Sequence, residues 1–132
     1  MANKVGITLR LTGLLLGDEL VKELNSHKLM VIPSLWEEPF GNVALEGMAC
    51  GCLVLASDGG GLPDAVGKAG LTFERGSVED LERKLSLIFN NPDIALELES
   101  HTKSHLRNHV EYTVCDKYLK ILEKNIPTKP FI

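Results

Sequence analysis

Short apolar runs alternate with helical patterns along the first 75 or so residues of the chain. The runs are rich in Leu, Val and Ile, which is typical of strands buried on both faces of a parallel sheet. They predict strands at residues 7–12, 28–33, 53–56 and 70–73. Because parallel strands are joined by right-handed crossovers through helices, this order predicts an α/β fold in which helices cover both faces of a four-stranded parallel sheet.

Apolar positions spaced three and four residues apart predict the helices. The first helix has Asp18 as its expected N-cap and Leu20, Val21 and Leu24 as its buried face. Five further helices are expected at about residues 42–50, 63–66, 78–89, 92–108 and 112–124.

Three of these helices carry boundary signals. Gly51 is placed to end the helix at 42–50 in a left-handed conformation. Ser77 is the expected N-cap of the fourth helix. Asn91 followed by Pro92 marks the start of the fifth, because proline is well tolerated at the first helical position.

The composition supports a packed domain and argues against several classes of protein. Hydrophobic residues make up 44% of the 132 residues, and we expect one domain at residues 1–126 followed by a tail at 127–132. The net charge of −4 is unlike that of a nucleic-acid-binding domain, which normally has a basic face, so no nucleic-acid partner is expected. No apolar run approaches the ~20 residues that span a bilayer, so any membrane contact is expected to be peripheral.

The three cysteines indicate a reducing compartment. Cys50 and Cys52 are separated by one residue, which is too close for ordinary disulfide geometry in a regular element, and Cys115 makes the number odd. Together with the lack of a recognisable signal peptide, this predicts a cytoplasmic protein in which Cys50 and Cys52 are small packing residues.

The segment from Pro33 to Glu46 holds the richest candidate chemistry. It follows a predicted strand and leads into a predicted helix, and ligands bind at this edge of open α/β sheets. Gly41 would let the backbone approach a ligand closely. The first amides of the helix, at residues 42–45, have no expected intrahelical partner, so with the helix dipole they predict an anion site suited to a diphosphate.

Two carboxylates flank this expected anion site. Glu46 lies about one turn into the helix, where it could accept two hydrogen bonds from a ribose diol. Glu38 precedes the helix and could reach the hydroxyls of a sugar beyond the phosphates. Taken singly, each glutamate is better explained as an exposed surface residue, so the prediction depends on their common setting.

That setting resembles a known signature. Glu38 and Glu46, with seven residues between them in the sequence PSLWEEPFGNVALEGMACG, resemble the E-x7-E motif of family 4 glycosyltransferases, which are retaining enzymes of the GT-B fold. Residues 54–64 are similar to the strand and Gly-Gly-x-Pro-Glu loop of that family, with Asp64 in place of the usual Glu. Residues 11–13 resemble the strand before the family's nucleobase loop, so the likeness covers nearly the whole chain.

The resemblance implies a truncated C-terminal domain of a GT-B enzyme, with a Rossmann-like sheet that binds a nucleoside-diphosphate sugar. Glu46 would hold the ribose, and Glu38 would be the catalytic residue that binds the transferred sugar. The sugar and diphosphate would lie against Glu38, Phe40, Gly41, Asn42 and Val43, and the base would be flanked by Gly13, Leu14 and Leu15. No metal is implied, and no cofactor besides the donor substrate.

The other parts of such an enzyme have no counterpart in this sequence. The resemblance implies that an acceptor-binding N-terminal domain, and an Arg and a Lys from the first βα units, would be supplied by a partner chain or a missing segment. Since a second negative charge at 4 Å from a phosphate costs about 1 kcal/mol even in water, a cation is expected to offset it. The chain could alternatively be a catalytically inactive fragment or interaction module, or part of a GT-B epimerase.

Three further features have two interpretations each. Gly59–Gly61 is either a flexible turn or a direct contact to donor or acceptor. His101, His105 and His109 recur every four residues, and a solvated helix face is expected rather than a zinc site because no Cys or carboxylate completes one. The last helix has an apolar stripe that either packs on its own domain or is partly exposed and allows self-association; it comprises Val114, Tyr118, Ile121 and Leu122.

Overall fold

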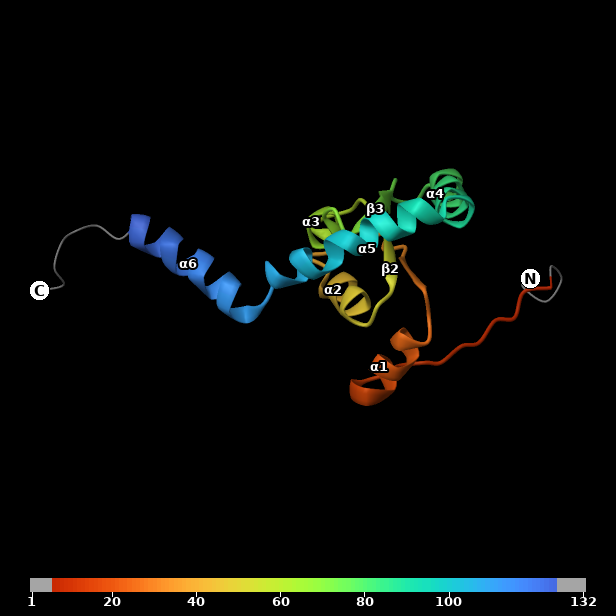
Figure 1. Ribbon diagram of the computed structural model, residues 1–132, viewed down its shortest axis with the longest axis horizontal. Helices are drawn as coiled ribbons and strands as arrows, with labels where there is room; N and C mark the ends of the chain where they lie inside the picture. Colours follow the sequence, from red (N-terminus) through yellow and green to blue (C-terminus); the bar gives the residue numbers. More distant parts are fainter. Residues whose placement is uncertain (1–5, 126–132) are drawn as a thin grey trace, which may run out of the picture.

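The computed structural model describes residues 6–125, which form six helices and a three-stranded sheet (Figure 1). The strands are β1 (Leu29–Ile32), β2 (Leu53–Ser57) and β3 (Gly70–Phe73). The helices are α1 (Gly17–Asn25), α2 (Asn42–Ala49), α3 (Leu62–Val66), α4 (Val78–Asn90), α5 (Pro92–Arg107) and α6 (Glu111–Asn125). The predicted strands at 28–33, 53–56 and 70–73 and all six predicted helices are confirmed.

The sheet is parallel throughout, in the order β1-β2-β3, with Leu29 opposite Leu53 and Val54 opposite Gly70. Side chains alternate across the central strand. Val54 and Ala56 face a core cluster shared with α2 and α3, whereas Leu55 faces a second cluster with Ile88 of α4. Helices therefore cover both faces of the sheet, as the sequence predicts.

The predicted strand at residues 7–12 is wrong. The segment runs extended before α1 and joins no sheet in the described part of the chain, so the sheet there has three strands instead of four. Ile7, Leu9 and Leu11 are 60%, 65% and 86% exposed. The alternating pattern favours an extended backbone, but a strand also needs a neighbour for its hydrogen bonds.

The predicted start of α1 is also wrong. The N-cap is Leu16, which makes no side-chain cap, and Asp18 lies inside the first turn, where its charge favours the helix dipole. The expected inner face is only partly covered, because Leu20 and Leu24 are half-buried and Val21 is exposed. Helix α1 lies at the margin of the molecule (Figure 1).

The expected caps further along the chain largely hold. Gly51 has a φ of +83° after α2, and the hydroxyl of Ser77 accepts a hydrogen bond from the Asp80 amide at 3.1 Å. Pro92 occupies the first turn of α5 as predicted. Asn91 is the N-cap residue of α5, but its side chain does not cap the helix. The side-chain amide of Asn91 donates to the Leu87 carbonyl at 2.8 Å.

Helix α6 extends away from the sheet (Figure 1) and has no fully buried residue. The expected tail at 127–132 lies outside the described residues. Within residues 6–125, no helix is both long enough and apolar enough to cross a membrane.

Candidate functional site

Three loops meet at the carboxyl edge of the sheet because parallel strands end on the same side. The loop of residues 33–41 follows β1, the glycine loop of residues 58–61 follows β2, and the loop of residues 74–77 follows β3. Backbone hydrogen bonds connect the glycine loop to the loop after β1 and to the end of β3. The Gly61 amide donates to the Glu38 carbonyl at 2.7 Å, and the Asp58 amide donates to the Phe73 carbonyl at 2.9 Å.

The side chain of Glu38 is held by two buried serines. The Ser34 hydroxyl donates to Glu38 Oε1 at 3.0 Å, and the Ser57 hydroxyl donates to the Ser34 carbonyl at 2.8 Å. Ser34 follows β1 and Ser57 ends β2, so the carboxylate is anchored to two strand ends. Neither serine was predicted as part of the site, although a small polar residue at the end of a buried strand is a recognisable signal.

The glycine loop packs closely on the backbone of the loop of residues 33–41, here called the Glu38 loop. Gly60 has a φ of +58°, and a Cβ there would lie 2.3 Å from the Glu38 carbonyl oxygen. A Cβ on Gly61 would lie 2.6 Å from the Phe40 Cα. These glycines are therefore required for the close approach of two loops, which explains them without a contact to donor or acceptor.

The start of α2 differs in detail from the expectation. Gly41 has a φ of +96°, and a Cβ there would lie 2.6 Å from Leu62 Cδ2, so the left-handed backbone and the packing against α3 both favour glycine without a ligand. The Ala44 amide donates to the Gly41 carbonyl at 2.9 Å in a tight first turn, so one of the four amides expected to form the anion site already has a partner, which lies just before the helix. In the described part of the chain, the amides of Asn42 and Val43 donate to no backbone carbonyl.

The two glutamates of the motif occupy different environments. Glu38 is half-buried in its loop, whereas Glu46 is exposed on α2, one turn beyond the free amides. Of the residues expected to hold sugar and diphosphate, Phe40 and Val43 are half-buried, Gly41 is buried and Asn42 is exposed. The structure thus gathers Glu38, Phe40, Gly41, Asn42, Val43 and Glu46 around one helix start at the carboxyl edge of the sheet.

Comparison with known proteins identifies the family. Residues 1–91 match the family described as "Glycosyl transferases group 1". The chain belongs to the group 1 glycosyltransferases.

Relatives of this glycosyltransferase chain are much longer than it is. It is similar to sulfoquinovosyl transferase SQD2 of Arabidopsis thaliana, with 40% identity over 85 residues, 61% of this chain and 16% of that protein. It is also similar to D-inositol 3-phosphate glycosyltransferase of Rhodococcus jostii, with 34% identity over 112 residues, 82% of this chain and 25% of that protein. The chain therefore spans about a quarter or less of the length of these two relatives.

Solved glycosyltransferase structures share the fold. Anabaena Alr3699/HepE in complex with UDP and glucose superimposes with a TM-score of 0.72 at 18% identity, over 95% of this chain and 35% of that chain. A glycosyltransferase from Rickettsia africae gives a TM-score of 0.70 at 20% identity, over 86% of this chain and 31% of that chain. The three-stranded sheet with its helices is thus a Rossmann-like α/β fold that matches GT-B glycosyltransferases.

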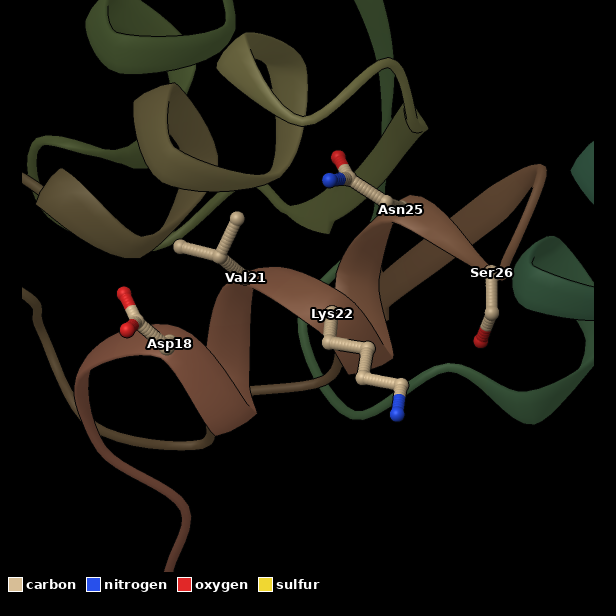
Figure 2. Close-up of a pocket in the computed structure, with 5 residues that line it drawn as sticks. All are labelled: Asp18, Val21, Lys22, Asn25 and Ser26. Carbon is tan, nitrogen blue, oxygen red and sulfur yellow. The ribbon is translucent and has the colours of Figure 1, made fainter.

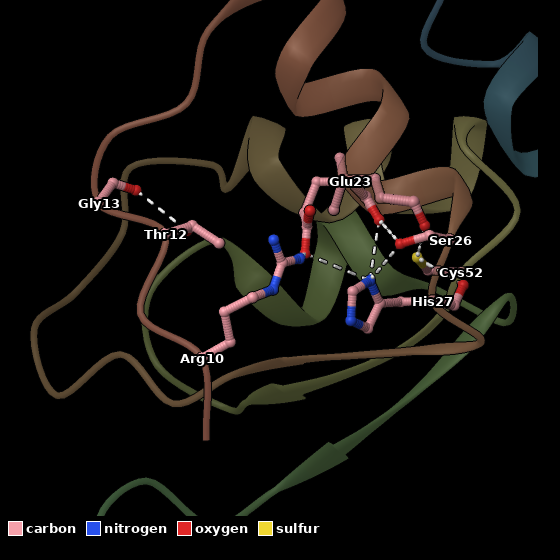
Figure 3. A network of polar contacts seen from close by, with 8 residues as sticks. Arg10, Thr12, Gly13, Glu23, Ser26, His27 and Cys52 are labelled. Carbon is pink, nitrogen blue, oxygen red and sulfur yellow. Dashed lines mark hydrogen bonds and ion pairs between the residues drawn. The ribbon is translucent and has the colours of Figure 1, made fainter. Parts of the chain in front are cut away.

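The residues expected to flank the nucleobase lie in the extended segment of the glycosyltransferase chain. Leu14 is 83% exposed, and Gly13 has a φ of +68° and accepts a bond from the Thr12 hydroxyl at 3.2 Å (Figure 3). Leu15 lines a hollow of about 440 Å³ that is formed only by residues between 10 and 26. That hollow contains no residue of the Glu38 loop, so the role of Gly13–Leu15 stays a prediction.

Helix α1 is held at the margin by a polar network (Figure 3). Arg10 pairs with Glu23, and His27 Nδ1 lies 2.8 Å from the Glu23 carbonyl oxygen. The thiol of Cys52, the residue before β2, donates to the Leu24 carbonyl at 3.2 Å. The outer side of α1 forms a shallow hollow of about 370 Å³, lined by Asp18, Val21, Lys22, Asn25 and Ser26 (Figure 2).

His105 of α5 and His109, which follows α5, pack against other parts of the molecule, so the expected solvated face is wrong for these two residues, and His101 is half-buried. His105 Nε2 lies 2.7 Å from the Ala65 carbonyl oxygen, and a Cβ on Gly67 would lie 2.5 Å from the His105 ring. The His109 ring lies 5.5 Å from the Phe40 ring, centroid to centroid. Within residues 6–125, no group of three or more His, Cys, Asp or Glu side chains could hold a metal ion.

Proposed function

We propose that this chain is the donor-binding C-terminal part of a family 4 retaining glycosyltransferase and that it binds a nucleoside-diphosphate sugar. The observation that carries the proposal is the anchoring of Glu38. Its carboxylate is held by Ser34 at the carboxyl edge of the sheet, beside the free amides of Asn42 and Val43 and one turn from Glu46.

The geometry supports a division of roles along the donor. The amides of Asn42 and Val43 point from a helix N-terminus, where the helix dipole favours an anion such as a diphosphate. The exposed carboxylate of Glu46 would accept hydrogen bonds from the ribose diol. Glu38 would accept hydrogen bonds from the hydroxyls of the transferred sugar and is the proposed catalytic residue. Uridine is the first base to test, since solved neighbours contain UDP or UDP-glucose.

Complete transfer requires parts that these residues do not supply. The chain corresponds to 16% to 25% of the curated relatives described above, so we propose that an N-terminal acceptor domain or a partner chain completes the enzyme. The proposed reaction needs no metal and no cofactor besides the donor. We place the protein in the cytoplasm, with any contact to a membrane being peripheral.

A two-dimensional amide NMR titration tests the donor site. The ligands are UDP, GDP and ADP, each compared with a corresponding nucleotide sugar. We expect shifts at Phe40–Glu46 and at Gly13–Leu15 with one base only, and we expect Glu46→Ala to weaken binding of both the nucleoside diphosphate and the nucleotide sugar with that base. Glu99→Ala is a matched control, because Glu99 is an exposed glutamate on α5.

Two results would contradict parts of this proposal. Shifts at Phe40–Glu46 that survive Glu46→Ala would remove the ribose role of that residue. No shifts at millimolar concentrations of all six ligands would favour the second candidate, a catalytically inactive interaction module. The large exposed apolar side chains of α6 favour that alternative, because they offer a surface for a partner or a second copy.

A further inference from the structure

Arg75 connects the three loops at the carboxyl edge. It lies in the loop after β3, and its amide donates to Asp58 Oδ1 in the glycine loop at 2.8 Å. Its guanidinium Nη1 lies 3.6 Å from Oε1 of Glu37, the residue before Glu38. A cation from this loop was not anticipated from the sequence, since nothing local to Glu74-Arg75-Gly76 indicates a partner 38 residues earlier in the chain.

The side chain of Arg75 reaches Glu37 by crossing Gly59. A Cβ on Gly59 would lie 3.0 Å from Arg75 Cδ and 3.3 Å from Arg75 Nη1. Gly59 is buried, while the Arg75 side chain is 37% exposed. The absence of a side chain at Gly59 therefore leaves the passage through which the arginine meets the Glu38 loop.

We propose that Arg75 is a positioning residue of the donor site, which holds the loop of residues 33–41 through Glu37 and thereby sets the place of the Glu38 carboxylate. This inference rests on the proposed function for its consequence in binding. The loop has two other attachments, the Gly61 amide on the Glu38 carbonyl and the Ser34 hydroxyl on its carboxylate. Arg75 adds a third attachment, on the outer side of the loop.

The positive charge of Arg75 also offsets negative charge at this edge of the sheet. Glu37, Glu38 and Asp58 bring three carboxylates to one edge, and a donor diphosphate would add further negative charge. An arginine guanidinium has a positive charge and five hydrogen-bond donors, so Arg75 offsets part of this repulsion. Because the pair with Glu37 is partly exposed, its effect is expected to be modest and weaker at high salt.

The test compares Arg75→Gln with Arg107→Gln, which removes the same charge from an exposed position near the end of α5. Amide hydrogen exchange is measured at Gly61, whose amide bonds to Glu38. The affinities of UDP and UDP-glucose are measured in parallel. We expect Arg75→Gln to accelerate amide exchange at Gly61. We also expect it to lower the affinity for UDP-glucose by about two- to fivefold, the range of an exposed ion pair. UDP should be affected less, since it lacks the sugar that Glu38 binds.

A charge exchange separates positioning from simple loss of packing. Glu37→Arg combined with Arg75→Glu restores an ion pair between the two loops, so it should recover slow exchange at Gly61. Unchanged exchange in Arg75→Gln, or equal losses for UDP and UDP-glucose, would overturn the positioning role. A wild-type chain that binds neither ligand would contradict the proposed function, and the exchange measurement would still decide whether Arg75 holds the loop.

Discussion

Glu38, the central residue of the candidate site, is held in place by serine and glycine residues that are not themselves proposed to contact the donor. Ser57 bonds to the Ser34 carbonyl, Ser34 bonds to the Glu38 carboxylate, and Gly60 lets the two loops meet. A buried chain of hydrogen bonds of this kind favours one side-chain position, because breaking it leaves polar atoms unpaired.

Gly60→Ala tests the close contact of the two loops. We expect it to lower the free energy of unfolding by more than about 2 kcal/mol, since a left-handed residue costs about 1 kcal/mol and the new Cβ also meets the Glu38 backbone. Gly51→Ala is the control, because Gly51 has a φ of +83° but nothing within 4 Å of the added Cβ. Urea denaturation of both variants measures the difference, and equal losses would show that the contact with Glu38 is not needed.

At the scale of the elements, hydrogen bonds and packing decide which helices and strands contact one another. The alternation of apolar and polar residues does not specify these contacts. The Cys52 sulfur lies 3.2 Å from the Leu24 carbonyl oxygen and 3.4 Å from the His27 carbonyl oxygen, so its single S–H connects the end of α1 to the residue before β2. His105 connects α5 to α3 through the Ala65 carbonyl. Both contacts join segments that are at least 25 residues apart in the sequence.

The thiol of Cys52 is predicted to be unreactive in the folded chain. Burial, and secondarily the neighbouring Cys50, raise the pKa of Cys52, which lowers the thiolate fraction. We expect iodoacetamide at pH 8 to label the exposed Cys115 on the order of tenfold faster than Cys52. Unfolding in urea should abolish this difference in rate. Mass spectrometry of the labelled peptides measures both rates, and equal labelling of Cys52 and Cys115 in the folded chain would contradict the burial.

The same shift in pKa has a consequence for stability. The pKa of Cys52 is higher in the folded than in the unfolded chain, so the unfolded chain loses this proton first as the pH rises. The contribution of the Cys52 thiol to the free energy of unfolding is therefore complete below the ordinary pKa of a thiol. It is lost as the pH rises through the pKa of Cys52 in the folded chain. The free energy of unfolding should fall at alkaline pH, and Cys52→Ser or Cys52→Ala should remove that part of the fall.

At the scale of the whole molecule, α6 has several large apolar side chains that are exposed in the described residues. Tyr118, Ile121 and Leu122 are 66%, 58% and 55% exposed, so the stripe expected from the sequence is largely open in the described residues. An exposed apolar helix face is typical of a surface that contacts another protein.

Self-association through α6 is expected as the concentration rises. Sedimentation velocity should show a shift from monomer to a larger species, and Ile121→Glu should reduce it, because a charge in the contact is costly to desolvate. Lys117→Glu is a control on the same helix, outside the apolar stripe. A monomer over the whole accessible concentration range would rule out self-association and favour a separate acceptor domain as the occupant of this face.

Much of the fold could be predicted from sequence because its signals are local. Three strands, six helices and the caps at Gly51 and Ser77 follow from periodicity and capping residues. The helix start between Glu38 and Glu46 was also found, because a strand, a glycine and a helix follow one another in the chain. The prediction of a strand at 7–12 was wrong because a strand must pair with a neighbouring strand, and the local pattern of residues does not specify that neighbour.

The sequence by itself determined the α/β class, the order of the elements and the membership of a glycosyltransferase family, because each depends on residues that are close in the chain. Only the tertiary structure decided how Glu38 is held, why Gly60 is a glycine, and that Arg75 reaches Glu37. These are contacts between loops that follow different strands. They exist because parallel strands end at one edge of the sheet, and their geometry depends on packing distances that no local pattern of residues encodes.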